Sequence, residues 1–404
     1  MRIAIVVPGR FHAFDLVRAL LSRGHDVVLL TNDPRWAVRR FGIPPHRAKG
    51  FWPHGVLLRL AEKVCAWLRI PYPEVTLCRI FGAWAASELR KDRWDLIHCW
   101  SGISKEILEW VPQICGPKLL MRGSSHIRAQ AKILEEEVRR TGFPVSRPSP
   151  GMIKREEAEY ALADHIRAIS RFAYQTFVEH GVPRSKLRLI PSAAPVEQFR
   201  PSRNVVEERC RRIESGAPLH LLYVGAISFR KGLWDLAAIF DALDMSSFKA
   251  RLVGSVTPEA RRFLSKSKLP AEILSHRPQS ELPQVYRWAD LFVFPTLEEG
   301  YAQVVAQAYA SAVPILTTDN CNGPDLIHDG RTGWIIPIRK PQAFAERLEW
   351  CHTYRAELAE VVRCVYGVYR PRTWAEVAEE FEVFLASIKG TGPSAQGEPD
   401  ADKR

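Results

Sequence analysis

The sequence predicts an α/β protein with two doubly wound parallel sheets, one in each half of the chain. Three observations support this prediction. Apolar β-type runs alternate with helical segments, this alternation restarts after residue 200, and 404 residues are too many for one ordinary core. Hydrophobic residues make up 46% of the chain and charged residues 25%, and no apolar run reaches the roughly 20 residues that span a bilayer.

The first half opens with an apolar strand over residues 3–7. This run is short and ends in a turn, so it is interpreted as a strand and not as a signal peptide. A helix with apolar residues at helical spacing follows over 14–22, Gly24 ends it, and the next strand covers 26–31. Further strands are expected at 95–99, 118–121, 166–170 and 187–190, with helices between them.

The second half repeats this order. Prolines at 191, 195 and 201 mark the connection, and strands are expected at 219–225, 250–254, 291–295 and 314–318, with a helix over 232–243. The predicted domains are therefore 1–197 and 198–371. A helix within 372–389 is expected to pack back on the first domain, and 390–404 has almost no apolar content and is expected to be disordered. Because ligands of open sheets bind beyond the carboxyl ends of the strands, two such domains would share one cleft.

The net charge of +12 belongs to the first half of the chain. Residues 1–200 contain 32 lysines and arginines against 19 aspartates and glutamates, whereas residues 201–404 contain 25 against 26. Such a basic surface favours an anionic partner, while a generally arginine-rich proteome is the alternative explanation. The basic residues are not interleaved with a nucleic-acid reading motif, so nucleic acid is not expected as a partner.

The strongest local signal lies in residues 294–315, FPTLEEGYAQVVAQAYASAVPI. An apolar strand runs into a Glu-Glu-Gly turn, and a helix of small residues follows. Gly300 lets the backbone approach a ligand closely, and the helix directs its free N–H groups at the same place, which favours phosphate. Glu299 and Gln307 lie slightly over two helical turns apart, so one can reach a sugar while the other reaches a ribose. An ordinary packing helix after a turn is the alternative.

This segment resembles the donor motif of glycosyltransferase family 4, which carries Glu, seven residues, and a second Glu. The resemblance extends over residues 1 to about 388 and is loosest over 35–115. It implies a GT-B fold with two Rossmann-like domains facing a cleft, a nucleoside diphosphate sugar as donor, and retention at the anomeric carbon. It also implies that Glu299 contacts the donor sugar and that Gln307 meets the ribose. The neutral amide of Gln307 departs from the second glutamate of the family.

A second motif, VGAISFRKG at 224–232, is a strand followed by a basic turn that opens a helix. Arg230 and Lys231 are well placed there to neutralise a diphosphate without a metal ion, and a solvated basic turn is the alternative. The family usually has Val-Gly-Arg at the strand end, so Ala226 is a departure, and Arg230 is expected to take over that charge. The full assignment places Arg230, Lys231, Gly9, Gly300 and Tyr301 at the donor diphosphate, and Gln307 and Arg277 at the ribose and base.

Two first-domain loops complete the predicted site. His126 ends the segment LLMRGSSH at 119–126 and resembles the family histidine that contacts the donor sugar across the cleft, so it is assigned a catalytic role together with Glu299. Surface decoration is the alternative for such a lone histidine. Arg10, His12 and Arg122 are assigned to the acceptor side. The first turn lacks a Gly-x-Gly-x-x-Gly fingerprint, which argues against a nicotinamide dehydrogenase.

Residues 51–68 form an apolar segment with tryptophans near both ends. A helix packed on its own sheet is the preferred interpretation. The alternative is an interfacial helix that docks on a membrane, because Trp52 and Trp67 lie beside Lys63 and Arg69.

The sequence thus predicts a glycosyltransferase of polysaccharide biosynthesis that moves a sugar from a nucleoside diphosphate sugar to a hydroxyl of a glycan, a lipid-linked acceptor or a small molecule. No Asp-x-Asp motif follows a first-domain strand, so neither a metal ion nor another cofactor is expected. Two alternatives stay open: a GT-B-fold nucleotide-sugar epimerase or hydrolase, and a pseudo-transferase, for which Gln307 and Ala226 are the motivating departures. The eight scattered cysteines indicate a reducing cytoplasm, and the basic first half suggests a peripheral position on the inner face of the membrane.

Overall fold

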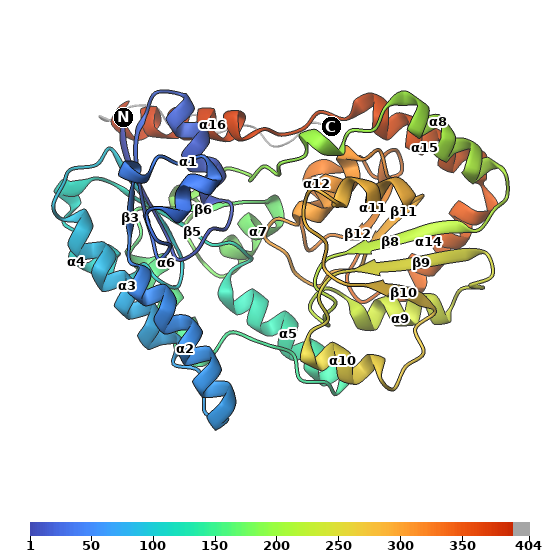
Figure 1. Cartoon of the computed structure of the whole chain (residues 1–404), viewed down its shortest axis with the longest axis horizontal. Helices are drawn as coiled ribbons and strands as arrows, with labels where there is room; N and C mark the ends of the chain where they lie inside the picture. Colours follow the sequence, from blue (N-terminus) through green and yellow to red (C-terminus); the bar gives the residue numbers. More distant parts are fainter. Residues whose placement is uncertain (391–404) are drawn as a thin grey trace.

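The computed structural model describes residues 1–390 as two α/β domains, each built on one parallel sheet (Figure 1). The first sheet has the strand order β3-β2-β1-β4-β5-β6-β7 and the second has the order β10-β9-β8-β11-β12-β13. In both, the chain starts near the middle of the sheet, winds to one edge, and returns to build the other half. The predicted class, two doubly wound parallel sheets, is confirmed.

The strands of the first sheet are β1 (Arg2–Val7), β2 (Asp26–Thr31), β3 (Ala48–Gly50), β4 (Leu96–Trp100), β5 (Lys118–Met121), β6 (His165–Ala168) and β7 (Leu187–Leu189). The second sheet contains β8 (Leu219–Val224), β9 (Phe248–Val253), β10 (Ala271–Leu274), β11 (Leu291–Phe294), β12 (Ile315–Thr318) and β13 (Gly333–Ile336).

The helices of the first half are α1 (Ala13–Ser22), α2 (Trp52–Leu68), α3 (Glu74–Leu89), α4 (Lys105–Trp110), α5 (Ile127–Thr141), α6 (Pro150–Leu162) and α7 (Arg171–Glu179). Those of the second half are α8 (Arg203–Glu214), α9 (Leu233–Asp241), α10 (Pro258–Leu264), α11 (Leu282–Trp288), α12 (Gln303–Ala310), α13 (Gly323–Leu326), α14 (Pro341–Thr353), α15 (Arg355–Val368) and α16 (Trp374–Gly390). Short 3-10 helices lie at Ala37–Phe41, Pro45–Arg47, Gln113–Cys115, Arg184–Lys186 and Glu197–Phe199.

The predicted strands are all present within two residues of their expected ends. The sequence did not predict β3, β10 and β13. Each has three or four residues and lies at an edge of its sheet. Two residues of β10 are exposed and β3 contains Lys49, so neither has the buried apolar run that identifies an inner parallel strand.

The last helix returns to the first domain. In Figure 1, α16 lies at the same end of the molecule as α1, and its apolar side chains, among them Val377, Phe381 and Leu385, join the core of the first sheet. Arg372, just before α16, donates to the carbonyl of Pro191 and pairs with Glu380 at 2.7 Å. The disorder predicted for 390–404 concerns residues that, from 391 on, lie outside the described part of the chain.

The end of α5 crosses in the other direction. Leu134 and Val145 belong to the core of the second sheet, and the ring of Phe143 stacks on Phe229 with centroids 5.0 Å apart. Arg140 forms a two-pronged ion pair with the buried Asp235 at 2.7 and 2.9 Å. The two domains are therefore joined by packing as well as by the chain connections.

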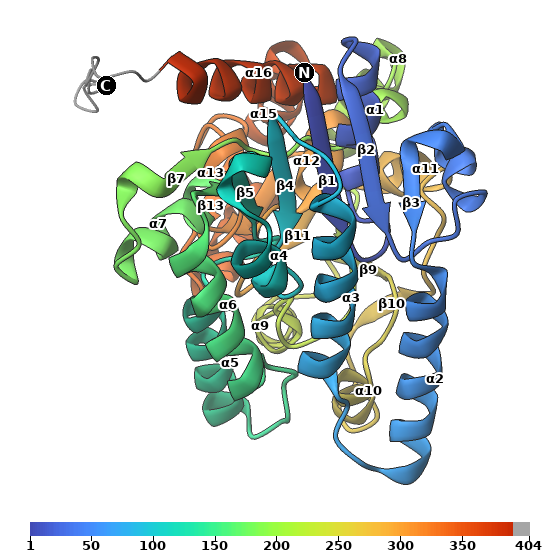
Figure 2. The same ribbon diagram turned by 90° about the vertical axis from the view of Figure 1, so that its left-hand side faces the viewer.

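Helix α2 does not pack on the first sheet, which was the preferred expectation for residues 51–68. Figure 2 shows it extending away from the first sheet, and only His54 and Cys65 are buried along its 17 residues. It contacts α3, and its first turn is fixed by Gly55, where a Cβ would lie 2.8 Å from the carbonyl oxygen of Asn32. The expectation of a helix packed on its own sheet is wrong, because the apolar residues of this segment face outward.

Gly232, in the turn after β8, lies close to the backbone of Pro295. Its φ is +82°, and a Cβ there would collide with the carbonyl oxygen of Pro295. Gly216 has a similar φ of +78° but open space around its Cβ position. We expect Gly232→Ala to lower the unfolding free energy by about 3 kcal/mol or more and Gly216→Ala by only about 1 kcal/mol, measured by urea denaturation. Equal losses would show that the close approach at Pro295 relaxes without cost.

Candidate functional site

The site is built where β8 and β11 of the second sheet end. The turn after β8 contains Arg230 and Lys231, and the turn after β11 contains Glu298, Glu299 and Gly300. Backbone hydrogen bonds hold the two turns together, since the N–H of Leu297 donates to the carbonyl of Arg230 at 3.0 Å. The parallel register of β8 and β11 thus brings the predicted basic and acidic motifs into contact.

Glu298 links this place to the first domain. Its side chain is fully buried. One carboxylate oxygen accepts hydrogen bonds from the hydroxyl of Ser124 and from the backbone N–H and hydroxyl of Ser125, the last two at 2.9 and 2.8 Å. The other oxygen accepts from Gln130 at 2.8 Å and from Arg230 at 3.4 Å. Burial by itself would raise the pKa of Glu298, but Arg230 and these hydrogen bonds bring it down to about 2.

The backbones meet at the same point. A Cβ on Gly300 would collide with the carbonyl of Gly123, so only glycine allows this approach between the two domains. Tyr301, the next residue, is half-buried and packs against the cores of both domains. Burial raises the pKa of its hydroxyl. These two residues therefore form part of the domain contact beside the predicted diphosphate site.

The two cations of the predicted diphosphate site are paired with the neighbouring glutamates. Lys231 forms an ion pair with Glu299, and Arg230 lies 3.6 Å from Glu299 and 3.4 Å from Glu298. Glu299 raises the pKa of Arg230, while burial lowers the pKa of Lys231. The cluster is nearly enclosed, because the side chains of Lys231 and Glu299 are only 15% and 10% exposed. Ionic interactions at such a place are stronger than they would be in bulk water.

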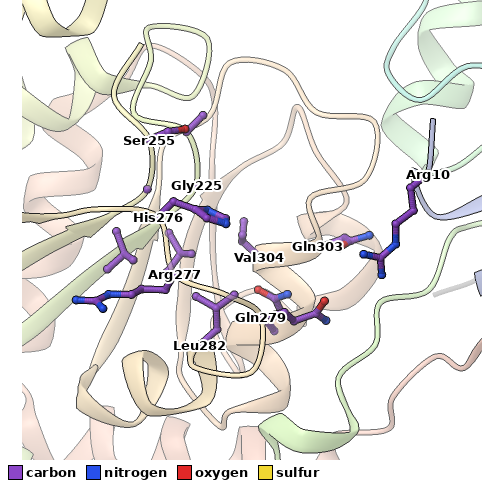
Figure 3. Close-up of a pocket in the computed structure, with 14 residues that line it drawn as sticks. Arg10, Gly225, Ser255, His276, Arg277, Gln279, Leu282, Gln303 and Val304 are labelled. Carbon is purple, nitrogen blue, oxygen red and sulfur yellow. The ribbon is translucent and has the colours of Figure 1, made fainter. Parts of the chain in front are cut away.

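A pocket of about 480 Å³ opens at the end of β8, where the turn towards Arg230 begins (Figure 3). Its walls come from the ends of β8 and β9, the segment after β10 and the first turns of α12, and from the first domain Arg10 points towards it. Its lining residues are Arg10, Val224, Gly225, Ala226, Val253, Gly254, Ser255, His276, Arg277, Gln279, Leu282, Gln303, Val304 and Gln307. The structure therefore brings together Gln307 and Arg277, which the sequence assigned to one ribose and base site.

Gln307 is held inside this wall. It is 4% exposed, and its side-chain oxygen accepts a hydrogen bond of 3.2 Å from the hydroxyl of the buried Tyr286. A carbonyl oxygen has a second lone pair, so Gln307 can still accept a hydrogen bond from a ligand hydroxyl. Gln303, one turn earlier on α12, lines the same pocket and was not singled out from the sequence.

His126 lies in the predicted loop after β5, and its side chain is buried in the first domain. Its ring is 3% exposed and stacks on His180 with centroids 4.4 Å apart, between Tyr160 and Phe177. Burial, with His180 beside it, lowers the pKa of His126 to about 3. Its side chain caps α5 by accepting from the N–H of Arg128 at 3.3 Å. The preceding serines turn inward to Glu298, His126 caps the helix, and it lines neither of the two pockets. Its assignment as a donor-sugar contact stays a prediction.

The acceptor-side residues are dispersed. The ring of His12 packs between Trp100 and Trp374, and burial, followed by Arg167, lowers its pKa to about 4. This neutral ring does not line the pocket that contains Gln307. Gly9 has a φ of +89° in the turn that presents Arg10, but it does not line the pocket itself. Of the predicted acceptor-side residues in the first turn, Arg10 lines the first pocket and His12 does not.

Arg122 lies at a second pocket of about 370 Å³. It is nearly buried, and its guanidinium pairs with Glu156 at 2.7 Å and donates to Gln130 at 2.9 Å. The lining residues of this pocket are Glu74, Arg122, Ile127, Gln130, Leu134, Ser146, Arg147, Pro148, Met152, Glu156 and Arg230. Arg230 also pairs with Glu298 and Glu299, so the second pocket and these two glutamates share one guanidinium. Among residues 1–390, no group of three His, Cys, Asp or Glu side chains is arranged to hold a metal ion.

Two facing Rossmann-like domains with polar pockets at their contact define the GT-B class. Crystal structures of that class superpose on the whole chain: HepE from Anabaena in complex with UDP and glucose has a TM-score of 0.65 at 14% identity, covering 96% of this chain and 100% of that one. Sucrose-phosphate synthase from Thermosynechococcus elongatus has a TM-score of 0.68 at 16% identity, covering 97% and 100%.

Sequence comparison gives the family. The model described as "Glycosyltransferase Family 4" matches residues 10–198, and the model described as "Glycosyl transferases group 1" matches residues 218–353. The chain therefore belongs to glycosyltransferase family 4.

Curated relatives of the chain are also glycosyltransferases, although their sequence identity to it is low. The D-inositol 3-phosphate glycosyltransferase of Corynebacterium glutamicum is 29% identical over 178 residues, which is 40% of this chain and 42% of that protein. The same enzyme of Corynebacterium jeikeium is 25% identical over 53% of this chain and 54% of its own length. This chain thus spans about half the length of these relatives. The GDP-mannose-dependent alpha-mannosyltransferase of Mycobacterium tuberculosis is 26% identical over 69% of this chain and 73% of its own length.

Glu298 predicts an acid-sensitive domain contact. Its folded pKa of about 2 lies below its ordinary value of 4.5, so its stabilising effect is fully present above about pH 4.5 and is lost as the pH falls towards 2. We expect this loss to be on the order of 3 kcal/mol in the unfolding free energy, and Glu298→Gln to lack it. Urea denaturation of the full chain between these pH values measures it. Glu135→Gln, an exposed glutamate on α5, is the control, and parallel pH curves for the wild type and Glu298→Gln would contradict the assignment.

Proposed function

We propose that the protein transfers a sugar from a nucleoside diphosphate sugar to a hydroxyl acceptor, with retention at the anomeric carbon. The observation that supports this most directly is the enclosed pair of Lys231 and Glu299. The pocket that Gln307 and Arg277 line begins at Gly225 and Ala226, in the same turn after β8 that contains Lys231. In this proposal the cation binds the diphosphate, the carboxylate accepts hydrogen bonds from sugar hydroxyls, and the pocket holds the nucleoside. The pocket volume of about 480 Å³ lies in the range of small-molecule sites.

In the proposed binding mode the nucleoside lies between Arg277 and Gln307, and the diphosphate crosses the turn that ends β8. The first turn of α12 faces this position, and its free N–H groups favour phosphate. The sugar would then extend towards Glu299 and Gly300. In this mode Ala226, where the family usually has arginine, contributes only backbone, because it lines the pocket at the strand end.

The proposed chemistry uses the glutamate pairing that the structure contains. A donor diphosphate competes with Glu299 for Lys231, so binding frees the carboxylate to accept hydrogen bonds from sugar hydroxyls. As the bond between the anomeric carbon and the phosphate oxygen breaks, Lys231 and Arg230 stabilise the charge that develops on the leaving group. These two cations supply the charge that a divalent ion would otherwise provide, so the reaction is proposed to be independent of metal ions and of other cofactors. Neither His12 nor His126 lines the pockets, so the departing phosphate oxygen takes the acceptor proton in this scheme.

The second pocket is the proposed acceptor site. It adjoins Arg230 on the first-domain side and contains the exposed Arg147 beside polar groups such as Gln130. An excess of 13 basic residues in the first 200 supports an anionic or lipid-linked acceptor, of the kind used in polysaccharide biosynthesis. No helix among residues 1–390 has the length and apolar content to cross a bilayer. We therefore propose a cytoplasmic protein that works at the inner face of the membrane.

A panel of nucleotide sugars in a thermal-shift assay tests the donor assignment. We expect one donor to raise the melting temperature, and Lys231→Ala to weaken its binding by about tenfold to a hundredfold, because a buried charge-assisted contact to phosphate is lost. Lys266→Ala, an exposed lysine of the same domain, should bind as the wild type does. Unchanged binding in both Lys231→Ala and Arg230→Ala would refute the diphosphate site. Donor binding without nucleotide release in the presence of any acceptor would favour a pseudo-transferase, and conversion of the donor alone would favour an epimerase or hydrolase.

Gln307→Glu tests the ribose contact. A carboxylate at this position keeps the hydrogen bond from Tyr286 and gives a ribose hydroxyl a charged acceptor. We expect donor affinity to rise by about threefold to tenfold, measured by calorimetry with the donor found in the panel. Gln303→Glu on the same pocket wall is the control for the added charge, and equal effects at both positions would show that no specific contact is made at residue 307.

A further inference from the structure

Helix α2 presents an unusual surface for a folded chain. The helix and the segment after it expose a series of large apolar side chains: Trp52, Val56, Leu57, Leu60, Val64, Trp67, Leu68, Ile70 and Tyr72. Trp67 is 81% exposed and Leu60 is 55% exposed. Single exposed apolar residues are ordinary, but a contiguous apolar surface of this kind marks a contact with a partner or a membrane.

The apolar residues lie on one side of the helix. Trp52, Val56, Leu60 and Val64 follow one another at four-residue steps, which places them along one stripe, and Trp67 continues it near the end. The side chains that α2 buries, His54 and Cys65, lie on the opposite side. The helix is thus fixed to the domain by a narrow face and holds its wide apolar face outward, as Figure 2 shows for its position beyond the sheet.

The charges at this surface are mainly positive. Arg59 and Lys63 lie four residues apart, which places them together beside the apolar stripe, and Arg69 follows the helix directly. Within the described part of the chain, none of these three side chains forms a salt bridge with an acidic residue. An apolar stripe bordered by unpaired lysine and arginine is the pattern of a helix that lies in the interface of an anionic bilayer.

The geometry of α2 fits a surface position. Its 17 residues make a helix of about 25 Å, shorter than the roughly 30 Å of a bilayer's apolar core, and its polar residues interrupt the run. Residues 391–404 of this chain cannot supply a cover for the stripe, because their sequence contains no large apolar residue. A second copy of the chain would bring the same basic residues face to face, which disfavours that occupant.

We infer that α2 docks the protein on an anionic phospholipid bilayer, with Trp52, Leu60 and Trp67 in the headgroup and acyl boundary. The acceptor pocket lies at the same end of the first domain, since Glu74, the first residue of α3, lines it and follows Arg69 closely in the chain. Docking therefore brings the opening of that pocket to the lipid surface, where a membrane-anchored acceptor is found. This consequence for the acceptor rests on the proposed transferase function, whereas the docking does not.

Sedimentation with vesicles tests the inference on the full chain. We expect binding to vesicles that contain phosphatidylglycerol, weaker binding to phosphatidylcholine alone, and a decrease with salt. Trp67→Ser and Val64→Asp should each lower binding by about tenfold or more. Val383→Asp is the matched control, because Val383 is also exposed on a helix, α16, at the opposite end of the molecule from α2.

The outcomes separate docking from transfer. Every variant is also measured for its thermal shift with the donor, and we expect no change, because α2 contributes no residue to the donor pocket. Vesicle binding that is equal in the wild type, Trp67→Ser and Val64→Asp would overturn the inference, as would a dimer in solution that dissociates in these variants without any vesicle binding. Vesicle binding that depends on α2, in a protein that no nucleotide sugar stabilises, would leave the docking standing and refute the transferase.

Discussion

The domain contact beside the proposed donor site depends on one buried carboxylate, Glu298. A charge taken out of water is costly unless hydrogen bonds and opposite charge satisfy it, and Glu298 meets this condition with donors from both domains. Its partners Ser125 and Gln130 belong to the first domain, and Arg230 belongs to the second. Since Glu298 and Glu299 are adjacent in one turn, fixing the first also fixes the second against Lys231. The position of the proposed donor site therefore follows from the satisfaction of a single buried charge.

The inner parts of both sheets were predictable because buried parallel strands have a strong sequence signal. The strands at 26–31 and 118–121 have the bounds that their apolar runs predicted. The edge strand β10 has an exposed face, and its position is set by pairing with β9, which no local pattern reveals. Helix α2 shows the converse limit. Its apolar spacing predicted a helix correctly, but the spacing of apolar residues does not say whether their common face meets a sheet or the outside.

The candidate site was also predictable only in part. The family motif predicted that Glu299, Gln307 and the basic turn share one site, because each follows a strand of one parallel sheet. The structure pairs Lys231 of the basic turn with Glu299, and Gln307 lines the first pocket. The motif does not predict which of the two consecutive glutamates, Glu298 or Glu299, contacts the first domain, because that depends on the conformation of the turn after β11. The same contact explains His126: the serines before it turn towards Glu298, and the imidazole is left to cap α5 inside the domain. The sequence signal for this contact was the Gly-Ser-Ser loop at 123–125 together with the Glu-Glu-Gly turn at 298–300.

The shared guanidinium connects ligand binding to the domain contact. Arg230 lies within 3.6 Å of both glutamates, and it also lines the second pocket. A phosphate that draws Arg230 or Lys231 away from Glu299 changes the charge that balances the buried Glu298, which in turn holds Ser124 and Ser125. A ligand that prefers one arrangement of these charges therefore shifts the equilibrium between the arrangements of the domain contact. By thermodynamic linkage, the domain contact changes the affinity for that ligand by the same free energy. In the proposed binding mode, donor binding, the domain contact and the second pocket are therefore not independent, because all three use the same buried charges.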